Sequence, residues 1–271
     1  MSFIDRFRTS DGIQIKYAID DFSPLWKSPS TVVMLHAAMG SMERFRAWVP
    51  AVSEKFRVVR WDMRGHGDSD EPDESLELSI DRLSRDLVEM LDHLELDSAH
   101  IVGSSTGGII AMRAAIQYPE RIRSIASYAA IPGLQPSTSH NDYEDWKHGL
   151  VQEGVRDFLR RTIRQRFHVD QVDPAFIDWF IENSARNNPV FLARFVKMMT
   201  QFDFSDRLPE IGCPVLAVVP SGDPVHSMEN YEVVKRVPNH KFIVYENMPH
   251  NITDAVPQRC VRDLMPFLES L

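Results

Sequence analysis

Short, largely apolar segments recur in the first and last parts of the chain, and amphipathic segments separate them. The apolar segments occupy residues 32–35, 57–61, 99–102, 124–128, 215–219 and 241–245. Such segments predict parallel strands covered on both faces, and the segments between them, such as 80–94, have helical periodicity. Near the start, 7–9 and 13–17 alternate around Ser10-Asp11-Gly12, which predicts a hairpin. The pattern predicts an α/β protein with about eight mostly parallel strands and helices on both faces of the sheet.

The alternation stops in the middle of the chain. From about Pro132 to Arg207 the apolar positions follow a helical period, which predicts an all-helical insertion. Its apolar anchors are mostly aromatic: Trp146, Phe158, Phe167, Phe176, Trp179, Phe180, Phe191 and Phe195. We therefore expect a core formed by residues 1–131 and 208–271, with residues 132–207 as a helical cap.

The composition is that of a soluble globular protein, with 43% hydrophobic and 25% charged residues in a chain of 271. A net charge of −9 argues against a nucleic-acid partner, because phosphate binding requires clustered Lys and Arg. Neither a membrane span nor a signal peptide is visible, so we expect a cytoplasmic protein with no membrane partner. Cys213 and Cys260 share no metal-ligand spacing and are expected to be reduced core thiols. The expected partner is a small-molecule substrate, and a homodimer remains open.

The segment Gly103-Ser104-Ser105-Thr106-Gly107 matches G-x-S-x-G, in which a serine nucleophile stands on a sharp turn between a strand and a helix. Glycines flank such a serine because the strand and the helix approach too closely for a Cβ group. Only the frame centred on Ser105 has glycine on both flanks, so Ser105 is the candidate nucleophile. The bare pattern also occurs in ordinary strand–helix turns, and its interpretation therefore depends on partner residues.

A serine nucleophile needs a general base, and the base needs an orienting carboxylate. Both are expected at the carboxyl ends of strands, where open α/β sheets gather their functional groups. Of the ten histidines, His250 directly follows the last strand and is the best-placed base, whereas His66 suits a structural role and His226 a surface position. Asp223 follows the 215–219 strand and is the candidate acid, although alone it could be an ordinary turn residue. Ser105, Asp223 and His250 stand in the chain order that this class requires.

Two backbone amides are expected to form an oxyanion hole for the negative charge that develops on the substrate. One belongs to Thr106, the residue after the nucleophile, and the other is assigned to Ala38, in the loop after the 32–35 strand. Asp223 and His226 could begin a metal site, but no further ligand accompanies them, so no metal is expected. No dinucleotide fingerprint is present either, and we expect no cofactor.

By these motifs the chain resembles the α/β-hydrolase fold superfamily over almost its whole length. His36-Ala37-Ala38-Met39-Gly40 is similar to the superfamily's His-Gly-x-x-Gly oxyanion loop, with Ala37 in place of the usual glycine. Arg64-Gly65-His66-Gly67-Asp68-Ser69 matches its R-G-x-G-x-S stretch. Segments 56–67 and 117–123 extend the likeness to the 3-oxoadipate enol-lactonase-like group and to serine esterases. The resemblance implies the α/β-hydrolase fold with a cap.

The favoured function is hydrolysis of a small-molecule ester or lactone through an acyl-enzyme on Ser105, with His250 as the base and Asp223 orienting it. Three alternatives use the same fold: a carbon–carbon bond hydrolase of vinylogous diketones, a cofactor-free oxygenase, and a non-catalytic ligand receptor. Release of a chromophore from a generic ester would separate a hydrolase from a receptor.

A helix expected at about 155–167 has one apolar and one basic face. Val155, Leu159 and Ile163 form the apolar stripe, and Arg156, Arg160 and Arg164 form the basic stripe at the same spacing. The simpler interpretation is a solvated face paired with nearby carboxylates. The alternative is that one of these arginines, or Arg161, enters the cleft and binds a carboxylate on the substrate, as the enol-lactonase resemblance would suit.

Overall fold

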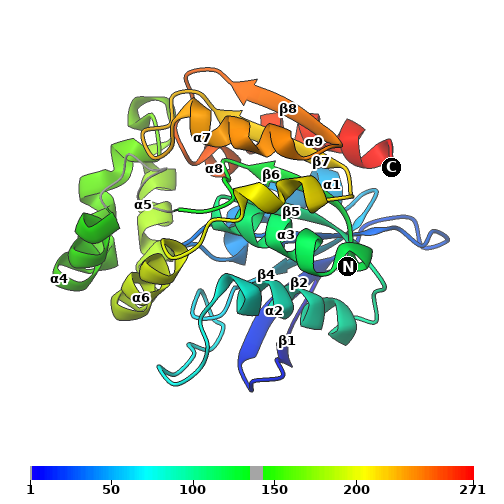
Figure 1. Cartoon of the computed structure of the whole chain (residues 1–271), viewed down its shortest axis with the longest axis horizontal. Coiled ribbons are helices and arrows are strands. Elements are labelled where there is room, and N and C mark those ends of the chain that lie inside the picture. Colours follow the sequence, from blue (N-terminus) through cyan, green and yellow to red (C-terminus); the bar gives the residue numbers. More distant parts are fainter. Residues whose placement is uncertain (1, 135–142) are drawn as a thin grey trace.

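The computed structural model describes residues 2–134 and 143–271, and an eight-stranded sheet runs through its centre (Figure 1). The strands are β1 (Ser2–Arg8), β2 (Gln14–Asp20), β3 (Thr31–Leu35), β4 (Arg57–Trp61), β5 (Ala99–Ser104), β6 (Ile122–Tyr128), β7 (Val215–Pro220) and β8 (His240–Tyr245). Their spatial order is β1-β2-β4-β3-β5-β6-β7-β8. β2 is antiparallel to both β1 and β4, and every other pair is parallel. The predicted hairpin and the predicted mostly parallel sheet are both confirmed.

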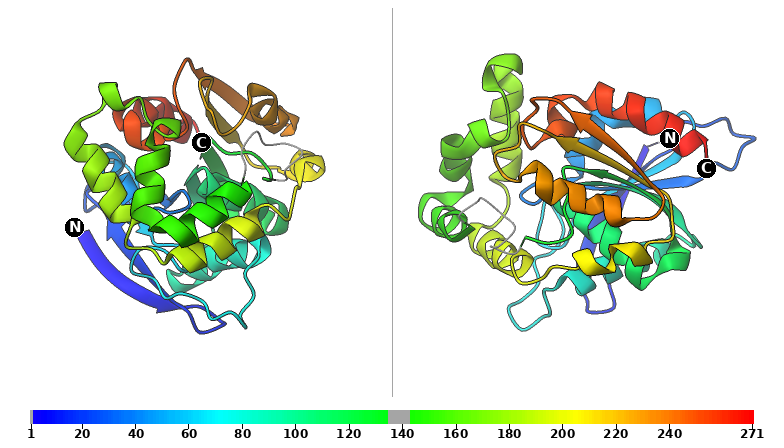
Figure 2. Two further views of the ribbon diagram at one scale, coloured as in Figure 1. Left: turned by 90° about the vertical axis from the view of Figure 1, so that its left-hand side faces the viewer. Right: turned by 45° about the horizontal axis from the view of Figure 1, so that its top comes forward.

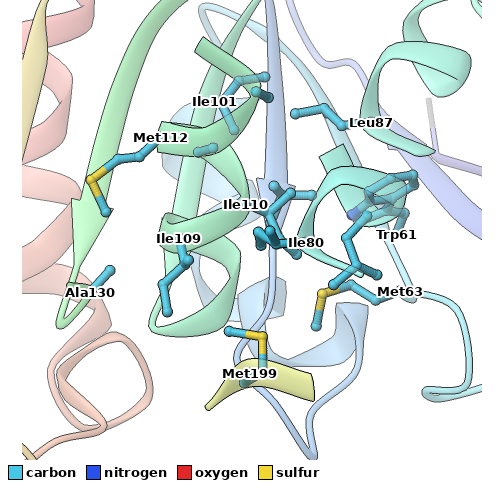
Figure 3. Close-up of a cluster of buried hydrophobic side chains, with 14 of the residues drawn as sticks. Trp61, Met63, Ile80, Leu87, Ile101, Ile109, Ile110, Met112, Ala130 and Met199 are labelled. Atoms are coloured by element: carbon cyan, nitrogen blue, oxygen red, sulfur yellow. The ribbon is translucent and has the colours of Figure 1, made fainter. Parts of the chain in front are cut away.

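Helices cover both faces of this sheet. Successive residues of a strand point to opposite sides, so an entirely apolar central strand has an apolar surface to bury on each face. In β3, Val33 and Leu35 join one apolar cluster, whereas Val32 and Met34 join the other. The first cluster includes α2 (Ile80–His93) and α3 (Thr106–Gln117), and Figure 3 shows Leu87 of α2 beside Ile101 of β5, with Ile109 and Ile110 of α3 in the same cluster. The second includes η1 (Met42–Trp48), α1 (Val49–Val52), α8 (Ile252–Ala255) and α9 (Pro257–Glu269). The all-buried β3 follows from this double cover.

Three longer helices stand to one side of the sheet and form the cap (Figures 1 and 2). They are α4 (Tyr143–Thr162), α5 (Pro174–Ser184) and α6 (Pro189–Met199), joined by η3 (Ile163–Gln165) and η4 (Val169–Gln171). The chain leaves the core and returns to it at one place, where Gly133 pairs with Asp203 in an isolated antiparallel bridge. All three helices fall within the expected cap, while η5 (Ser205–Glu210) crosses its expected end at residue 207 and packs on α3 of the core.

Three short helices complete the fold. η2 (Pro119–Arg121) joins α3 to β6 and contacts both, and α7 (Met228–Glu232) and η6 (Val233–Arg236) connect β7 to β8. Cys213 and Cys260 are free thiols; Cys260 is buried and Cys213 is partly exposed. Within the described ranges, none of the helices combines the length and apolarity that crossing a bilayer requires.

Candidate active site

Ser105 stands on the turn between β5 and α3, where the backbone adopts an unusual conformation. Its φ is 48° and its ψ is −114°, a region that non-glycine residues rarely occupy. Hydrogen bonds on both sides hold this geometry: the Ser105 amide donates to the Tyr128 carbonyl at 2.7 Å, and the Gly108 amide donates to the Ser105 carbonyl at 2.9 Å. The turn is therefore fixed by β6 on one side and by the first turn of α3 on the other.

The flanking glycines are required by the closeness of the surrounding backbone. A Cβ atom on Gly103 would lie 2.4 Å from the carbonyl carbon of Gly107, and one on Gly107 would lie 2.1 Å from the carbonyl oxygen of Leu35. Neither separation is compatible with van der Waals contact. Ser104, the alternative serine, is buried and shares a 2.8 Å hydrogen bond with the Thr253 hydroxyl. Its hydroxyl is engaged in the core, in contrast to that of Ser105.

His250 and Asp223 meet Ser105 from two other loops at the same edge of the sheet. His250 Nε2 lies 3.0 Å from Ser105 Oγ, and His250 Nδ1 lies 2.7 Å from Asp223 Oδ2. Because a carboxylate only accepts hydrogen bonds, Nδ1 carries the ring proton, which leaves Nε2 free to accept the serine proton. The structure thus brings together the three residues that the sequence singled out, in the geometry of a nucleophile, a base and an orienting acid.

The Asp223 side chain is fully buried and receives hydrogen bonds on both carboxylate oxygens. The Val225 amide donates to Oδ1 at 2.7 Å, while the Tyr231 hydroxyl donates to Oδ2 beside His250. Burial alone would raise the pKa of Asp223, but the neighbouring His250, with the hydrogen bonds from His250 and Tyr231, holds that pKa below its usual value. Asp223 is therefore ionised at neutral pH. No sequence motif marks Tyr231, so its contact with Asp223 could not be predicted from the sequence.

His226 is the clearest correction to the sequence prediction, which placed it at the surface. Only 4% of it is exposed, and its ring centroid lies 5.5 Å from that of His250 in an edge-to-face contact. Its Nδ1 is buried and has no hydrogen-bond partner among the described residues. Burial, reinforced by His250, lowers the pKa of His226 to about 3, so the ring is neutral. The turn after Asp223 places His226 against His250. The spacing of three residues between Asp223 and His226 does not predict this contact.

The loop after β3 lies beside the Ser105 turn because β3 pairs directly with β5. Its shape is held by His36, which is completely buried: Nδ1 contacts the Ala37 carbonyl at 2.7 Å, and Nε2 accepts from the Met63 amide at 3.0 Å. In the part of the chain that the structure describes, the amides of Ala38 and Thr106 donate no hydrogen bond. Neither amide therefore has a protein acceptor in this part of the chain, which the predicted oxyanion role requires. His66 is buried between Phe191 and Phe195, in line with the structural role expected for it.

The cap is attached to the loops that carry these groups. Asn187 donates to the Met39 carbonyl at 3.2 Å and accepts from the Gly67 amide at 2.9 Å. On the other side, the Asn251 amide donates to the Arg166 carbonyl at 3.2 Å, and His168 Nε2 lies 2.7 Å from the Asn247 carbonyl. The helical insertion therefore contacts both the loop after β3 and the loop that carries His250.

The four cap arginines proposed from the sequence pair with carboxylates instead of entering the site. Arg156 pairs with Glu182, Arg160 with Asp157, Arg161 with Glu153 and Asp145, and Arg164 with Asp170. Their side chains are 44–73% exposed. The predicted helix also ends early, since α4 stops at Thr162 and continues only as the 3₁₀ turn η3. The solvated, paired face is therefore the correct interpretation.

Comparison with known proteins identifies the family. The family model for the alpha/beta hydrolase fold matches residues 30–254. The chain belongs to the α/β-hydrolase fold family. A Bacillus subtilis protein with the provisional name 2-succinyl-6-hydroxy-2,4-cyclohexadiene-1-carboxylate synthase is 27% identical, with 97% of each chain covered. 3-Oxoadipate enol-lactonase 1 of Acinetobacter baylyi is 24% identical over 82% of each chain.

Solved structures place the same fold over the whole molecule. The enol-lactonase from Burkholderia xenovorans superposes with a TM-score of 0.89, covering 98% of this chain and 100% of that one at 18% identity. The resemblance stated from the motifs is confirmed, and with lactonases, esterases and carbamate hydrolases among its relatives the chain is a hydrolase of this fold.

Proposed function

We propose that this protein hydrolyses a carboxylic ester or lactone of a small molecule through an acyl-enzyme on Ser105. The observation that carries the proposal is the continuous hydrogen-bonded line from Ser105 through His250 to Asp223. The lactonase and esterase names among the relatives support this substrate class. The Bacillus relative is named as a synthase and not as a hydrolase, so the experiment below tests the reaction type as well as the substrate.

In the first half of the reaction, Ser105 Oγ attacks the substrate carbonyl while His250 Nε2 takes the hydroxyl proton. The negative charge that forms on the carbonyl oxygen is received by the Ala38 and Thr106 amides. Asp223 holds the Nδ1 tautomer and stabilises the imidazolium that appears. His250 then returns its proton to the leaving alkoxide, and the acyl group stays on Ser105.

In the second half, a water molecule takes the place of the leaving group. His250 removes one of its protons, the hydroxide attacks the acyl carbonyl, and the proton returns to Ser105 Oγ as the acid departs. A lactone follows the same path, but its alkoxide remains tethered to the acyl group and leaves as one hydroxy acid. Neither route requires a metal or an organic cofactor, because His250 Nε2 carries out every proton transfer and Asp223 stays ionised throughout.

The proposal is tested by fluorophosphonate labelling together with turnover of p-nitrophenyl butyrate. We expect wild type to be labelled and to release p-nitrophenol over many turnovers, and Ser105→Ala to do neither. Ser104→Ala is the matched control: it removes the neighbouring hydroxyl, which bonds Thr253, and should retain most of the activity. Labelling without turnover would favour a ligand receptor, and an active Ser105→Ala variant would refute the proposal.

A further inference from the structure

One buried cation in the cap has no counter-charge among residues 2–134 and 143–271. Five arginines of the described chain are buried: Arg44, Arg60, Arg64, Arg82 and Arg166. The first four each form an ion pair with a buried aspartate, namely Asp254, Asp20 or Asp86. Arg166, only 5% exposed, forms an ion pair with no carboxylate that the structure describes. Because a buried charge normally requires a partner, this exception calls for an explanation.

Only one of the three guanidinium nitrogens of Arg166 donates hydrogen bonds within the described ranges. Nη1 donates to the Thr162 carbonyl at 3.1 Å and to the Thr162 hydroxyl at 2.8 Å. The guanidinium carbon lies 5.0 Å from the Trp146 ring centroid and 5.7 Å from that of Phe158. Within the described ranges, its Nε and Nη2 groups donate no hydrogen bond. These are the groups that could bind a planar carboxylate in a fork.

Arg166 keeps its charge at neutral pH in spite of this environment. Burial, with a smaller contribution from the charge of Arg44, lowers the pKa of Arg166 to about 10. Arg44 does not offer a second free cation, because Asp254 pairs with it at 3.2 Å. A single unpaired guanidinium balances a single negative charge, so its expected ligand is a carboxylate. A phosphate dianion is usually bound by several clustered cations.

The position of Arg166 links it to the proposed catalytic residues. Its carbonyl accepts from the amide of Asn251, the residue after His250. The Trp146 ring under the guanidinium lies 5.5 Å from the Tyr143 ring. Tyr143 in turn lies near Tyr231: burial, then Asp223 and lastly Tyr143 raise the pKa of the Tyr231 phenol, which donates to Asp223. These contacts connect the segment that carries Arg166 to the loops that carry His250 and Asp223.

We propose that Arg166 is the receptor for a carboxylate on the substrate, so that the ester or lactone cleaved at Ser105 carries a free carboxylate elsewhere. This inference rests on the proposed function for the identity of the cleaved bond. It assigns to Arg166 the role that the sequence suggested for the arginines at 156, 160, 161 and 164, all of which are paired at the surface. The carboxylate of the bound substrate is the counter-charge for Arg166.

Binding is measured in the Ser105→Ala background, where no acyl-enzyme can form, so the result does not depend on the catalytic proposal. The probes are the monomethyl esters of succinate, glutarate, adipate and pimelate, each compared with its dimethyl ester by calorimetry. We expect at least one half-ester to bind more tightly than its diester. Arg166→Met should reduce that preference about 10- to 100-fold, as expected for loss of a charge-assisted bidentate contact. Arg160→Met, an exposed arginine of the same cap, is the matched control and should leave the preference unchanged.

A second readout separates a binding role from a structural one. If Arg166 is held unpaired for a ligand, Arg166→Met removes an unfavourable buried charge and should unfold at the same or a higher temperature than its parent. Arg166→Lys should keep part of the preference for the half-ester, because it keeps the charge but not the fork. Two results would overturn the proposal: no half-ester preferred over its diester, or an Arg166→Met variant that weakens half-ester and diester equally.

Discussion

Replacing Asp223 with Asn probes the proposed mechanism most sharply, because it changes a charge without changing a shape. Asp223 accepts from three donors: the Val225 amide, the His250 ring and the Tyr231 hydroxyl. An asparagine whose oxygen stays on the Val225 amide must turn its NH₂ group toward His250. The imidazole then relieves the clash of two donors by moving its proton to Nε2, where it can no longer accept from Ser105.

The expected size of the effect follows from this tautomer change. A base held in the wrong tautomer costs about 10⁴-fold in kcat, which corresponds to about 5 kcal/mol in the activation barrier. KM should change little, because the Asp223 side chain is fully buried and contacts the side of His250 that faces away from Ser105. The assay is the steady-state hydrolysis of p-nitrophenyl butyrate at neutral pH, with circular dichroism to show that the variant is folded.

The matched control is Tyr231→Phe, which removes one donor to the same carboxylate but leaves its charge and the His250 contact in place. Loss of one hydrogen bond to a charged group should reduce kcat at most about 100-fold. An Asp223→Asn rate close to that of wild type would mean that another group orients His250. Equal losses in the two variants would mean that packing around Asp223, and not the tautomer, limits the rate.

Two further predictions concern stability. Gly107→Ala places a Cβ atom 2.1 Å from the Leu35 carbonyl oxygen and should cost about 3 kcal/mol or more, whereas Gly212→Ala, with no described atom within 4 Å, should stay within about 0.5 kcal/mol in urea unfolding. His226 has a folded pKa of about 3 against 6.5 for the free side chain, so the unfolded chain binds a proton that the folded protein does not. Wild type should therefore lose stability as the pH falls from about 6.5, at about 1.4 kcal/mol per pH unit from this residue, and His226→Phe should lack that part of the loss. Parallel stability curves for wild type and His226→Phe would contradict this account.

The fold was predictable because its determinants are local. The apolar segments identify strands covered on both faces, and the resulting order of strands brings the ends of β5, β7 and β8 to one edge of the sheet. The loops that follow these strands therefore lie along one edge of the sheet. This is why Ser105, Asp223 and His250 could be selected from the sequence, and why the structure places them in contact.

The cap contacts were not predictable in the same way. Helical periodicity separated the apolar stripe of the 155–167 segment from its arginines, but it could not tell that the helix ends at Thr162 and that Arg166 turns inward. The carboxylates that neutralise the other arginines include Glu182, which comes from α5. His226 was misplaced for a related reason, since a turn residue after a strand can point outward or fold back over its neighbour. Which of these happens depends on packing between segments distant in the sequence.

The central claim, that Ser105 carries the acyl group, is tested most directly by mass spectrometry of the enzyme during turnover. Wild type is mixed with p-nitrophenyl butyrate, quenched in acid within the first turnovers, digested and analysed. The account predicts a butyryl group on the peptide that contains residues 103–107, with fragmentation placing it on Ser105 and not on Ser104. Sustained p-nitrophenol release with Ser105 unmodified at every quench time, or a butyryl group on another residue, would contradict it.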